Sequence, residues 1–260
     1  MTAHDQATNT GSIKVLFLGQ CLQYGYGNVG KASTYVSLTA SMLRARFPGL
    51  KFKFDLKYLY HPAGLKALLK HRMFFYPPDI ALLNLPAMFA ATTWRVNLVY
   101  EMAPEIVDTA RSFMQKIEAK MKGNTGPPEM TTMIDKAFAL RRPLSVAEYE
   151  RLVQEALEEC VGATPCRFVL LGPGRFNEET IEDYAVHSPE VWSSVNQMVQ
   201  RLGNRFNVPA VSAQEALAEY GGEVFTPNNH RWSEYGHEIV AREVESVLAL
   251  QVAHLSRSGS

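Results

Sequence analysis

The sequence predicts an α/β protein with three layers, in which helices cover both faces of a mostly parallel, flavodoxin-like sheet. Apolar runs typical of buried strands alternate along the chain with segments whose apolar residues recur at helical spacing. Such an order implies right-handed crossovers between parallel strands. With 260 residues, 47% of them hydrophobic, the chain is long enough for one domain with a full core and an insertion.

The first part of the chain alternates strands with helices. Residues 13–19 form an apolar run that ends in glycine, which predicts the first strand, and residues 31–46 carry two apolar stripes at helical spacing. Residues 51–60 alternate apolar and polar side chains, which predicts a strand with one face covered. A short helix is expected after Pro62. The continuous apolar run at residues 80–85 suits a central parallel strand.

The second part of the chain begins with a long helical stretch. Residues 92–142 are expected to form an inserted helical cap or dimerisation element within a single domain that spans residues 1–260. Ser145 and Glu148 have the spacing of a capping box and mark the start of the next helix. The remaining predictions are strands at 167–171 and 208–211 and helices at 145–160, 189–206 and 233–250.

Charge and cysteine content exclude several classes of function. Acidic and basic residues balance at 26 each, so nothing indicates a nucleic-acid partner. Residues 1–12 are polar and lack the apolar core of a secretory signal, and the first apolar run is too short to span a bilayer, so a cytoplasmic protein without a membrane span is expected. Cys21, Cys160 and Cys166 cannot all pair and lack metal-site spacing, so we expect no disulfide framework, metal or cofactor. A small-molecule substrate is the class that remains.

A glycine-rich stretch after the first strand suggests nucleotide binding as one alternative. Gly25–Gly30 matches G-x-G-x-x-G, and Asp55 follows on the second strand. The register is poor, because in that motif the first glycine comes directly off the strand, whereas Gly25 lies several residues beyond Gly19. Gly25 also begins a P-loop-like pattern, but Ala32 stands where a magnesium-binding hydroxyl is needed. Glycines that only shape a turn before the helix explain the stretch more simply.

Four short blocks, taken in chain order, carry a family resemblance. They are residues 17–25 after the first strand, Gly64 before a helix, residues 78–85 in the third strand, and residues 228–237 before the last helix. In this order they resemble the G-D-S-L block, the second-block glycine, the strand before the G-x-N-D block and the D-x-x-H block of the SGNH, or GDSL-type, hydrolase family. The resemblance implies an SGNH-like fold and an ester or thioester hydrolase or acyltransferase with a small acyl substrate.

The first and third blocks depart from the family pattern. Cys21 stands at the nucleophilic serine, Gln20 at the preceding aspartate, Pro86 at the third-block glycine and Met88 at the asparagine that donates to the oxyanion. A thiol is only about two pKa units above neutrality, so it needs less help from a base than a hydroxyl does. The resemblance therefore implies Cys21 as nucleophile, and the Cys21 and Gly64 N–H groups as oxyanion donors.

The last block permits two alignments. With His230 as the base, Pro227 occupies the position of the triad aspartate, and Asn228 is the side chain that orients the imidazole, as in a Cys-His-Asn triad. With the spacing to Gly236 kept, Arg231 falls on the histidine position and Asn228 on the aspartate. The sequence leaves both open. The expected substrate-binding candidates are Gln20, Asn84, Arg231 and Trp232, although Asn84 also suits a satisfied buried amide.

The number of altered family positions supports a second hypothesis, a catalytically degenerate SGNH-fold protein that binds a ligand or partner without chemistry. Nucleotide binding at Gly25–Gly30 is the third. Residues 92–142 carry apolar residues such as Met102, Phe113 and Met121, which suit a cover for an acyl chain, a core helix or the interface of a homodimer.

Overall fold

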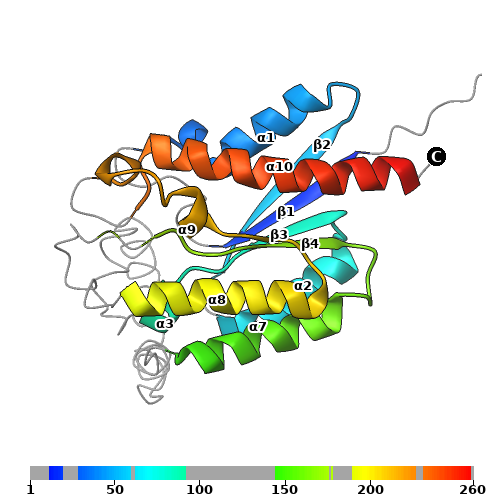
Figure 1. Cartoon of the computed structure of the whole chain (residues 1–260). Coiled ribbons are helices and arrows are strands. Elements are labelled where there is room, and N and C mark those ends of the chain that lie inside the picture. The colour runs from blue at the N-terminus through cyan, green and yellow to red at the C-terminus, as the bar shows by residue number, and fades with distance from the viewer. Residues whose placement is uncertain are drawn as a thin grey trace, which may run out of the picture.

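A computed structural model describes residues 12–19, 29–59, 62–91, 144–175, 177, 189–226 and 231–258. In these ranges five strands form one parallel sheet in the order β2-β1-β3-β4-β5 (Figure 1). This is the strand order of doubly wound, flavodoxin-like folds, so the expected fold class is confirmed. The strands are β1 (Ile13–Gly19), β2 (Phe52–Tyr58), β3 (Ile80–Asn84), β4 (Arg167–Leu171) and β5 (Ala210–Val211).

Helices cover both faces of the sheet, as Figure 1 shows. One layer contains α1 (Tyr35–Arg46) and α10 (Glu234–Ser258), and the other contains α2 (Leu65–Phe75), α7 (Val146–Cys160) and α8 (Pro189–Phe206). Successive side chains of a strand point to opposite faces, so β1 contributes to a separate apolar core under each layer.

The helix predicted at residues 31–46 is interrupted near its start. A 3-10 turn, η2 (Lys31–Ser33), precedes α1, and Thr34 between them has an extended backbone. The Thr34 hydroxyl accepts a hydrogen bond from Ser37 N at 3.4 Å and caps α1. A side chain that caps a helix needs a non-helical backbone, which explains why one predicted helix became a turn followed by a helix.

The capping box at the start of α7 is confirmed. Glu148 N donates to Ser145 Oγ at 3.1 Å, and Ser145 N donates to Glu148 Oε2 at 3.0 Å. The last helix, α10, runs to Ser258, beyond the predicted residue 250, because its apolar stripe continues through the buried Val252. Two one-turn helices were not predicted, α3 (Met88–Ala91) and α9 (Ala213–Ala216).

The predicted insertion, residues 92–142, lies outside the described residues. Its two flanks meet, because Leu144 N donates to Phe89 O at 3.1 Å and the rings of Phe89 and Tyr149 pack edge-to-face with centroids 5.5 Å apart. The chain therefore leaves and rejoins the body of the domain at one place. The insertion and the single-domain organisation stay predictions. Within the described ranges no helix is both long and apolar enough to cross a bilayer.

Candidate functional site

The carboxyl edge of the sheet gathers the segments that the sequence singled out. In open parallel sheets, ligands bind in the crevice beyond the carboxyl ends of the strands. Here β1 ends at Gly19, β3 at Asn84 and β4 at Leu171, and Leu59 N, just past the end of β2, donates to Gly19 O at 2.6 Å. The described ends of β1, β2, β3 and β4 therefore lie along one edge of the sheet.

The predicted catalytic residues Cys21, Asn228 and His230, with Gln20, lie outside the described residues. Their nearest described neighbours are fixed, since Gly19 precedes Gln20 directly. Residues 227–230 are flanked by Thr226 and Arg231, and Thr226 N donates to Arg231 O at 2.8 Å. This hydrogen bond closes the stem of a loop that we call the base loop, residues 226–231.

Gly64 lies where the resemblance predicts an oxyanion donor. It ends the 3-10 turn η3 (Pro62–Gly64) and directly precedes α2. It is exposed, and no heavy atom outside its own chain neighbours lies within 4 Å of the position that a Cβ would take. The first N–H groups of a helix have no intrahelical partner, so this position can present a donor to a ligand.

Asn84 and Trp232 are buried near the carboxyl edge of the sheet, since Asn84 ends β3 and Trp232 lies against Gly174, just after β4. Asn84 is 2% exposed, and its Nδ2 donates to Tyr35 Oη at 3.3 Å, as expected for a satisfied buried amide. Trp232 is also 2% exposed and packs edge-to-face on Tyr35 and on His237, with centroids 5.9 and 5.4 Å away. Both side chains are therefore part of the interior of the fold, next to the carboxyl edge of the sheet.

His237 packs beside these side chains, against the rings of Trp232 and Tyr35. Tyr35 N donates to His237 Nδ1 at 3.1 Å, so the neutral ring carries its proton on Nε2. Burial lowers the pKa of His237 from 6.5 to about 4. Because the His237 ring stays neutral and its Nδ1 accepts a backbone hydrogen bond, His237 has a structural role rather than that of a catalytic base.

The backbone of Arg231, next to Trp232, is held by hydrogen bonds from Thr226. Trp232 pairs with Phe225 in an antiparallel bridge, and the Thr226 hydroxyl also donates to Arg231 O, at 3.4 Å. A second guanidinium, not predicted from the sequence, lies close by: Arg175 stacks 5.4 Å from the Phe225 ring centroid and its Nη2 donates to Gly221 O at 3.3 Å. The base loop is thus bordered by cationic side chains.

The Gly172-Pro-Gly174 loop after β4 has a packing explanation. A Cβ at Gly172 would overlap Asn196 Oδ1, and a Cβ at Gly174 would lie 2.5 Å from Trp232 Nε1. Each glycine therefore admits one side chain from a later helix or loop. Neither partner is apparent from the sequence around these glycines.

The two described cysteines do not suit nucleophilic chemistry. Cys160 and Cys166 are free and buried. Burial raises the pKa of the Cys160 thiol, and burial together with the nearby Asp79 carboxylate raises the pKa of Cys166 to about 12. Thiols of this kind stay protonated and inert, which leaves Cys21 as the candidate among the three cysteines.

The nucleotide alternative finds no support at the second strand. Asp55 lies in the middle of β2, opposite Leu16, rather than at its carboxyl end. Its carboxylate is paired with Lys57 and Arg72, each at 3.1 Å, so it is not presented to a ribose. Residues 25–28 of the glycine pattern lie outside the described part. Across the described residues, no group of three or more His, Cys, Asp or Glu side chains is placed to hold a metal ion.

The five-stranded parallel sheet with helices on both faces defines a three-layer α/β fold. No protein-family model matches the sequence, and no curated protein matches it significantly. Solved structures do match. Axe2, an acetylxylan esterase from Geobacillus stearothermophilus, superposes with a TM-score of 0.60 at 16% identity, over 92% of this chain and 95% of that one.

Two further structures match to a similar degree. A lipase/acylhydrolase from Enterococcus faecalis gives a TM-score of 0.55 at 14% identity, with 90% of this chain and 96% of that chain covered. LAE5, an alpha/beta hydrolase from the metagenome of Lake Arreo in Spain, gives a TM-score of 0.57 at 16% identity, with 92% of this chain and 97% of that chain covered. These likenesses extend over nearly the whole of each chain and confirm the fold that the four sequence blocks predicted.

Proposed function

We propose that this chain is an SGNH-type hydrolase or acyltransferase that acts on an ester or thioester of a small acyl substrate. One observation carries the proposal. Gly19, two residues before Cys21, ends β1, Gly64 follows β2, and Trp232, just after the base loop, lies against Gly174 just after β4. A nucleophile, an oxyanion donor and a base are needed around one reacting carbonyl. Their described neighbours lie along the carboxyl edge of the sheet, which supports the proposal.

The proposed chemistry is acyl transfer through a thioester. His230 takes the proton of the Cys21 thiol while the sulfur attacks the acyl carbonyl carbon, and Asn228 orients the imidazole. The N–H groups of Cys21 and Gly64 donate to the oxyanion. His230 then returns the proton to the departing alkoxide or thiolate. Water or an acceptor alcohol attacks the acyl-Cys21 bond with His230 again as base, which regenerates the free thiol.

The solved structures are consistent with this chemistry. Axe2 is an esterase, and its catalytic mutants replace a serine or an aspartate with alanine. Cys21 would take the place of the serine here, and Asn228 rather than an aspartate would orient the base. Met88, on α3, stands where the family has an oxyanion-donating asparagine. Loss of one such donor elsewhere costs about 10²–10³ in kcat, so slow turnover is expected.

The test is a comparison of thiol variants with aryl esters and acyl thioesters. Cys21→Ala should abolish turnover, whereas the matched control Cys160→Ala, which removes a buried thiol remote from the edge, should retain it. Iodoacetamide should label Cys21 before Cys160 and Cys166, because the latter are 2% and 8% exposed. Unchanged turnover in Cys21→Ala would rule out the nucleophile.

A degenerate binding protein is the second candidate, and the reason for it is the alignment through Gly236. A Cβ there would overlap Val224 O, and Gly236 N donates to Ser233 Oγ at 3.2 Å, so this residue must be glycine. If Gly236 is the family's glycine, the spacing puts Arg231 on the base position. Activity lost in His230→Ala but kept in Arg231→Ala supports the enzyme. A wild type without turnover on any acyl substrate supports the binding protein.

A homodimer through residues 92–142 is part of the proposal. Sedimentation velocity on the full chain and on a chain in which a short Gly-Ser linker replaces these residues would test it, because Phe89 and Leu144 already hold the two flanks together. A monomer in both cases would contradict it.

A further inference from the structure

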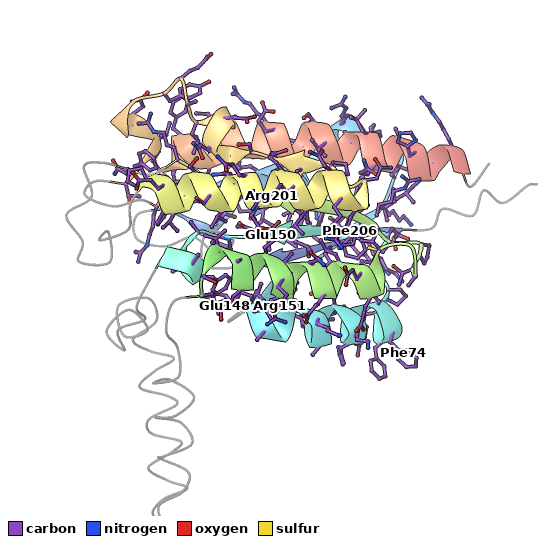
Figure 2. The ribbon with its side chains drawn as sticks, turned by 60° about the horizontal axis from the view of Figure 1, so that its bottom comes forward. Phe74, Glu148, Glu150, Arg151, Arg201 and Phe206 are labelled. Carbon is purple, nitrogen blue, oxygen red and sulfur yellow. The ribbon has the colours of Figure 1, made fainter. Side chains whose placement is uncertain are left out.

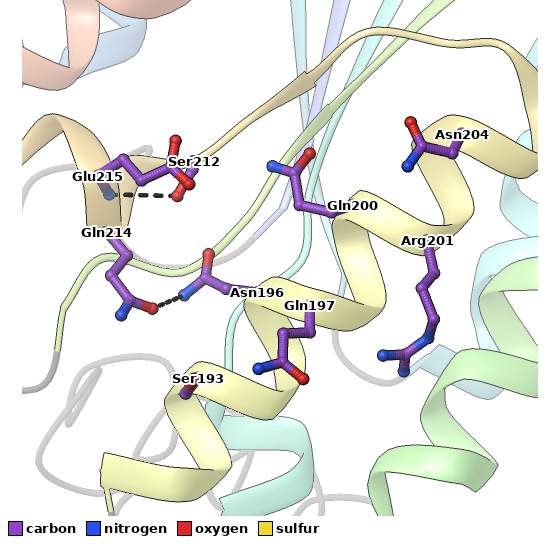
Figure 3. A pocket seen from close by; sticks show the side chains of 9 residues that line it. All are labelled: Ser193, Asn196, Gln197, Gln200, Arg201, Asn204, Ser212, Gln214 and Glu215. Atoms are coloured by element: carbon purple, nitrogen blue, oxygen red, sulfur yellow. Dashed lines mark hydrogen bonds between the residues drawn. The ribbon is translucent and has the colours of Figure 1, made fainter.

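A groove lined by polar, hydrogen-bonding side chains lies between α8 and α9. It has a volume of about 440 Å³ and is open to solvent (Figure 3). Two hydroxyls and five carboxamides line it, and its charged members are Arg201 and Glu215. The lining residues are Ser193, Asn196, Gln197, Gln200, Arg201, Asn204, Ser212, Gln214 and Glu215.

Four of these side chains form a stripe on α8. Ser193, Gln197, Gln200 and Asn204 follow one another at helical spacing, so they fall within about 60° of the helix circumference over about 16 Å. Within the described part of the chain none of the four has a side-chain hydrogen bond or ion pair. The stripe therefore presents donors and acceptors that the fold itself does not use.

The stripe differs from the face that α8 turns to α7. There Arg201 makes two hydrogen bonds to Glu150, at 3.0 and 2.7 Å (Figure 2), and Arg205 bonds to Gln154 and Glu158 at 3.0 and 3.2 Å. Ion pairs of this kind are the usual content of exposed helix surfaces. Arg201 forms an ion pair with Glu150, so it brings little net charge to the groove. The stripe itself is neutral, and Glu215 is the other charged residue of the lining.

The opposite wall of the groove is rigidly held. Asn196, 7% exposed, donates through Nδ2 to Gln214 Oε1 at 2.7 Å and to Trp192 O at 3.2 Å (Figure 3). This bond fixes the Gln214 side chain and leaves its Nε2 group without a partner among the described residues. Ser212 Oγ accepts from Glu215 N at 3.1 Å and caps α9. The wall residues are thus positioned before any ligand arrives.

The chemistry of the lining selects one class of ligand. We propose that the groove between α8 and α9 binds a neutral oligosaccharide. A carboxamide both donates and accepts, as does a sugar hydroxyl, so a row of amides matches a row of hydroxyls without the desolvation cost of burying charge. A polyanion would need uncommitted cations, and a peptide would need apolar pockets, whereas every lining side chain is polar.

The groove also reaches the candidate site. Asn196, at its inner end, contacts Gly172 directly after β4, which is part of the carboxyl edge. A chain of sugars in the groove can therefore extend toward the carboxyl end of β4. Binding in the groove needs no catalysis, so it stands whether the crevice is an enzyme site or a degenerate one.

Isothermal titration of the Cys21→Ala protein tests the proposal without turnover. The probes are uncharged cello-, xylo-, malto- and chito-hexaose, with heparin as a charged comparison. At least one hexaose should bind with one-to-one stoichiometry. A variant that combines Gln197→Ala, Gln200→Ala and Asn204→Ala should bind about tenfold more weakly or worse, since three hydrogen-bonding groups are lost.

The matched control is Gln154→Ala, which removes an amide of α7 that is bonded to Arg205 and lies outside the groove. It should bind the hexaose as the parent does. The triple variant should unfold at the parent's temperature, because the three side chains make no described hydrogen bond. No binding of any hexaose at 10-fold molar excess and millimolar concentration, equal binding by the triple variant, or binding of heparin alone would overturn the proposal.

Discussion

His237 makes the stability of this fold depend on pH. Its ring is 1% exposed and accepts a hydrogen bond from Tyr35 N, and burial lowers its pKa from 6.5 to about 4. The folded state therefore holds the neutral ring, whereas the unfolded chain takes up a proton as the pH falls below 6.5. Stability is complete above that pH and is lost between 6.5 and 4. The loss is about 3 kcal/mol in all, of which about 2 kcal/mol has occurred at pH 5.

The assay is urea denaturation from pH 8 to pH 5 on the parent and on His237→Asn. The asparagine Oδ1 lies near the position of the imidazole Nδ1, so it can accept from Tyr35 N, but it does not titrate. All other groups titrate in both proteins and cancel in the comparison. The free energy of unfolding of the parent should fall by about 2 kcal/mol more than that of the variant. Parallel pH profiles would show that His237 is not buried in the neutral form.

Three further substitutions test the packing, each by urea denaturation at pH 8. Ser145→Ala removes the α7 capping box and should cost about 1 kcal/mol, and an unchanged midpoint would show that the cap does not form. Leu157→Ala removes a fully buried side chain and should cost about 2–5 kcal/mol, so a cost below 1 kcal/mol would contradict its place in the core. Gly236→Ala forces a methyl group against Val224 O and should cost about 1–3 kcal/mol or more, whereas a neutral effect would contradict the close approach.

Long elements with a clear period were predictable from the sequence. Strand β4 and helix α8 have the bounds that the apolar pattern predicted, because one is an unbroken apolar run and the other has a strong stripe over five turns. Helix α9, four residues long, is shorter than the window in which a period is visible. Strand β5 is reduced to Ala210–Val211, since only two residues of the predicted strand pair with β4.

The sequence predicted the carboxyl edge of the sheet, where the candidate site is expected, but not the contacts between side chains along it. Strand ends and glycines in the sequence locate the carboxyl edge, because parallel strands end there together. The reason for Gly172 and Gly174 lies in Asn196 and Trp232, which meet these glycines only after the chain has folded. Likewise, Gln197 and Gln200 look like an ordinary polar helix face until α9 supplies the opposite wall. Pairings between distant segments carry no local signal.

The choice between His230 and Arg231 as base can be made by mutation because the stem of the base loop is held by other groups. The hydrogen bonds from Thr226 N to Arg231 O and from Ser233 N to Val224 O involve only the backbone, so they survive a change of either side chain. The Trp232 anchor beneath them is 2% exposed and packs on Tyr35 and His237. Substitution of His230 or Arg231 is therefore expected to leave the stability of the domain within about 0.5 kcal/mol.

A loss of turnover with unchanged stability then reports on chemistry alone. If His230→Ala is inactive and Arg231→Ala is active, the histidine provides the base although it is one residue out of the family spacing. The other outcome is a parent protein that binds an acyl ligand without turning it over, and an Arg231→Ala variant that binds this ligand more weakly. In that case Arg231 occupies the position of the family's base and contacts the ligand instead of acting as a base. Arg175, stacked on Phe225 beside the same stem, is the control in that case, because its Nη2 already donates to Gly221 O. Arg175→Ala should then alter ligand binding less than Arg231→Ala does.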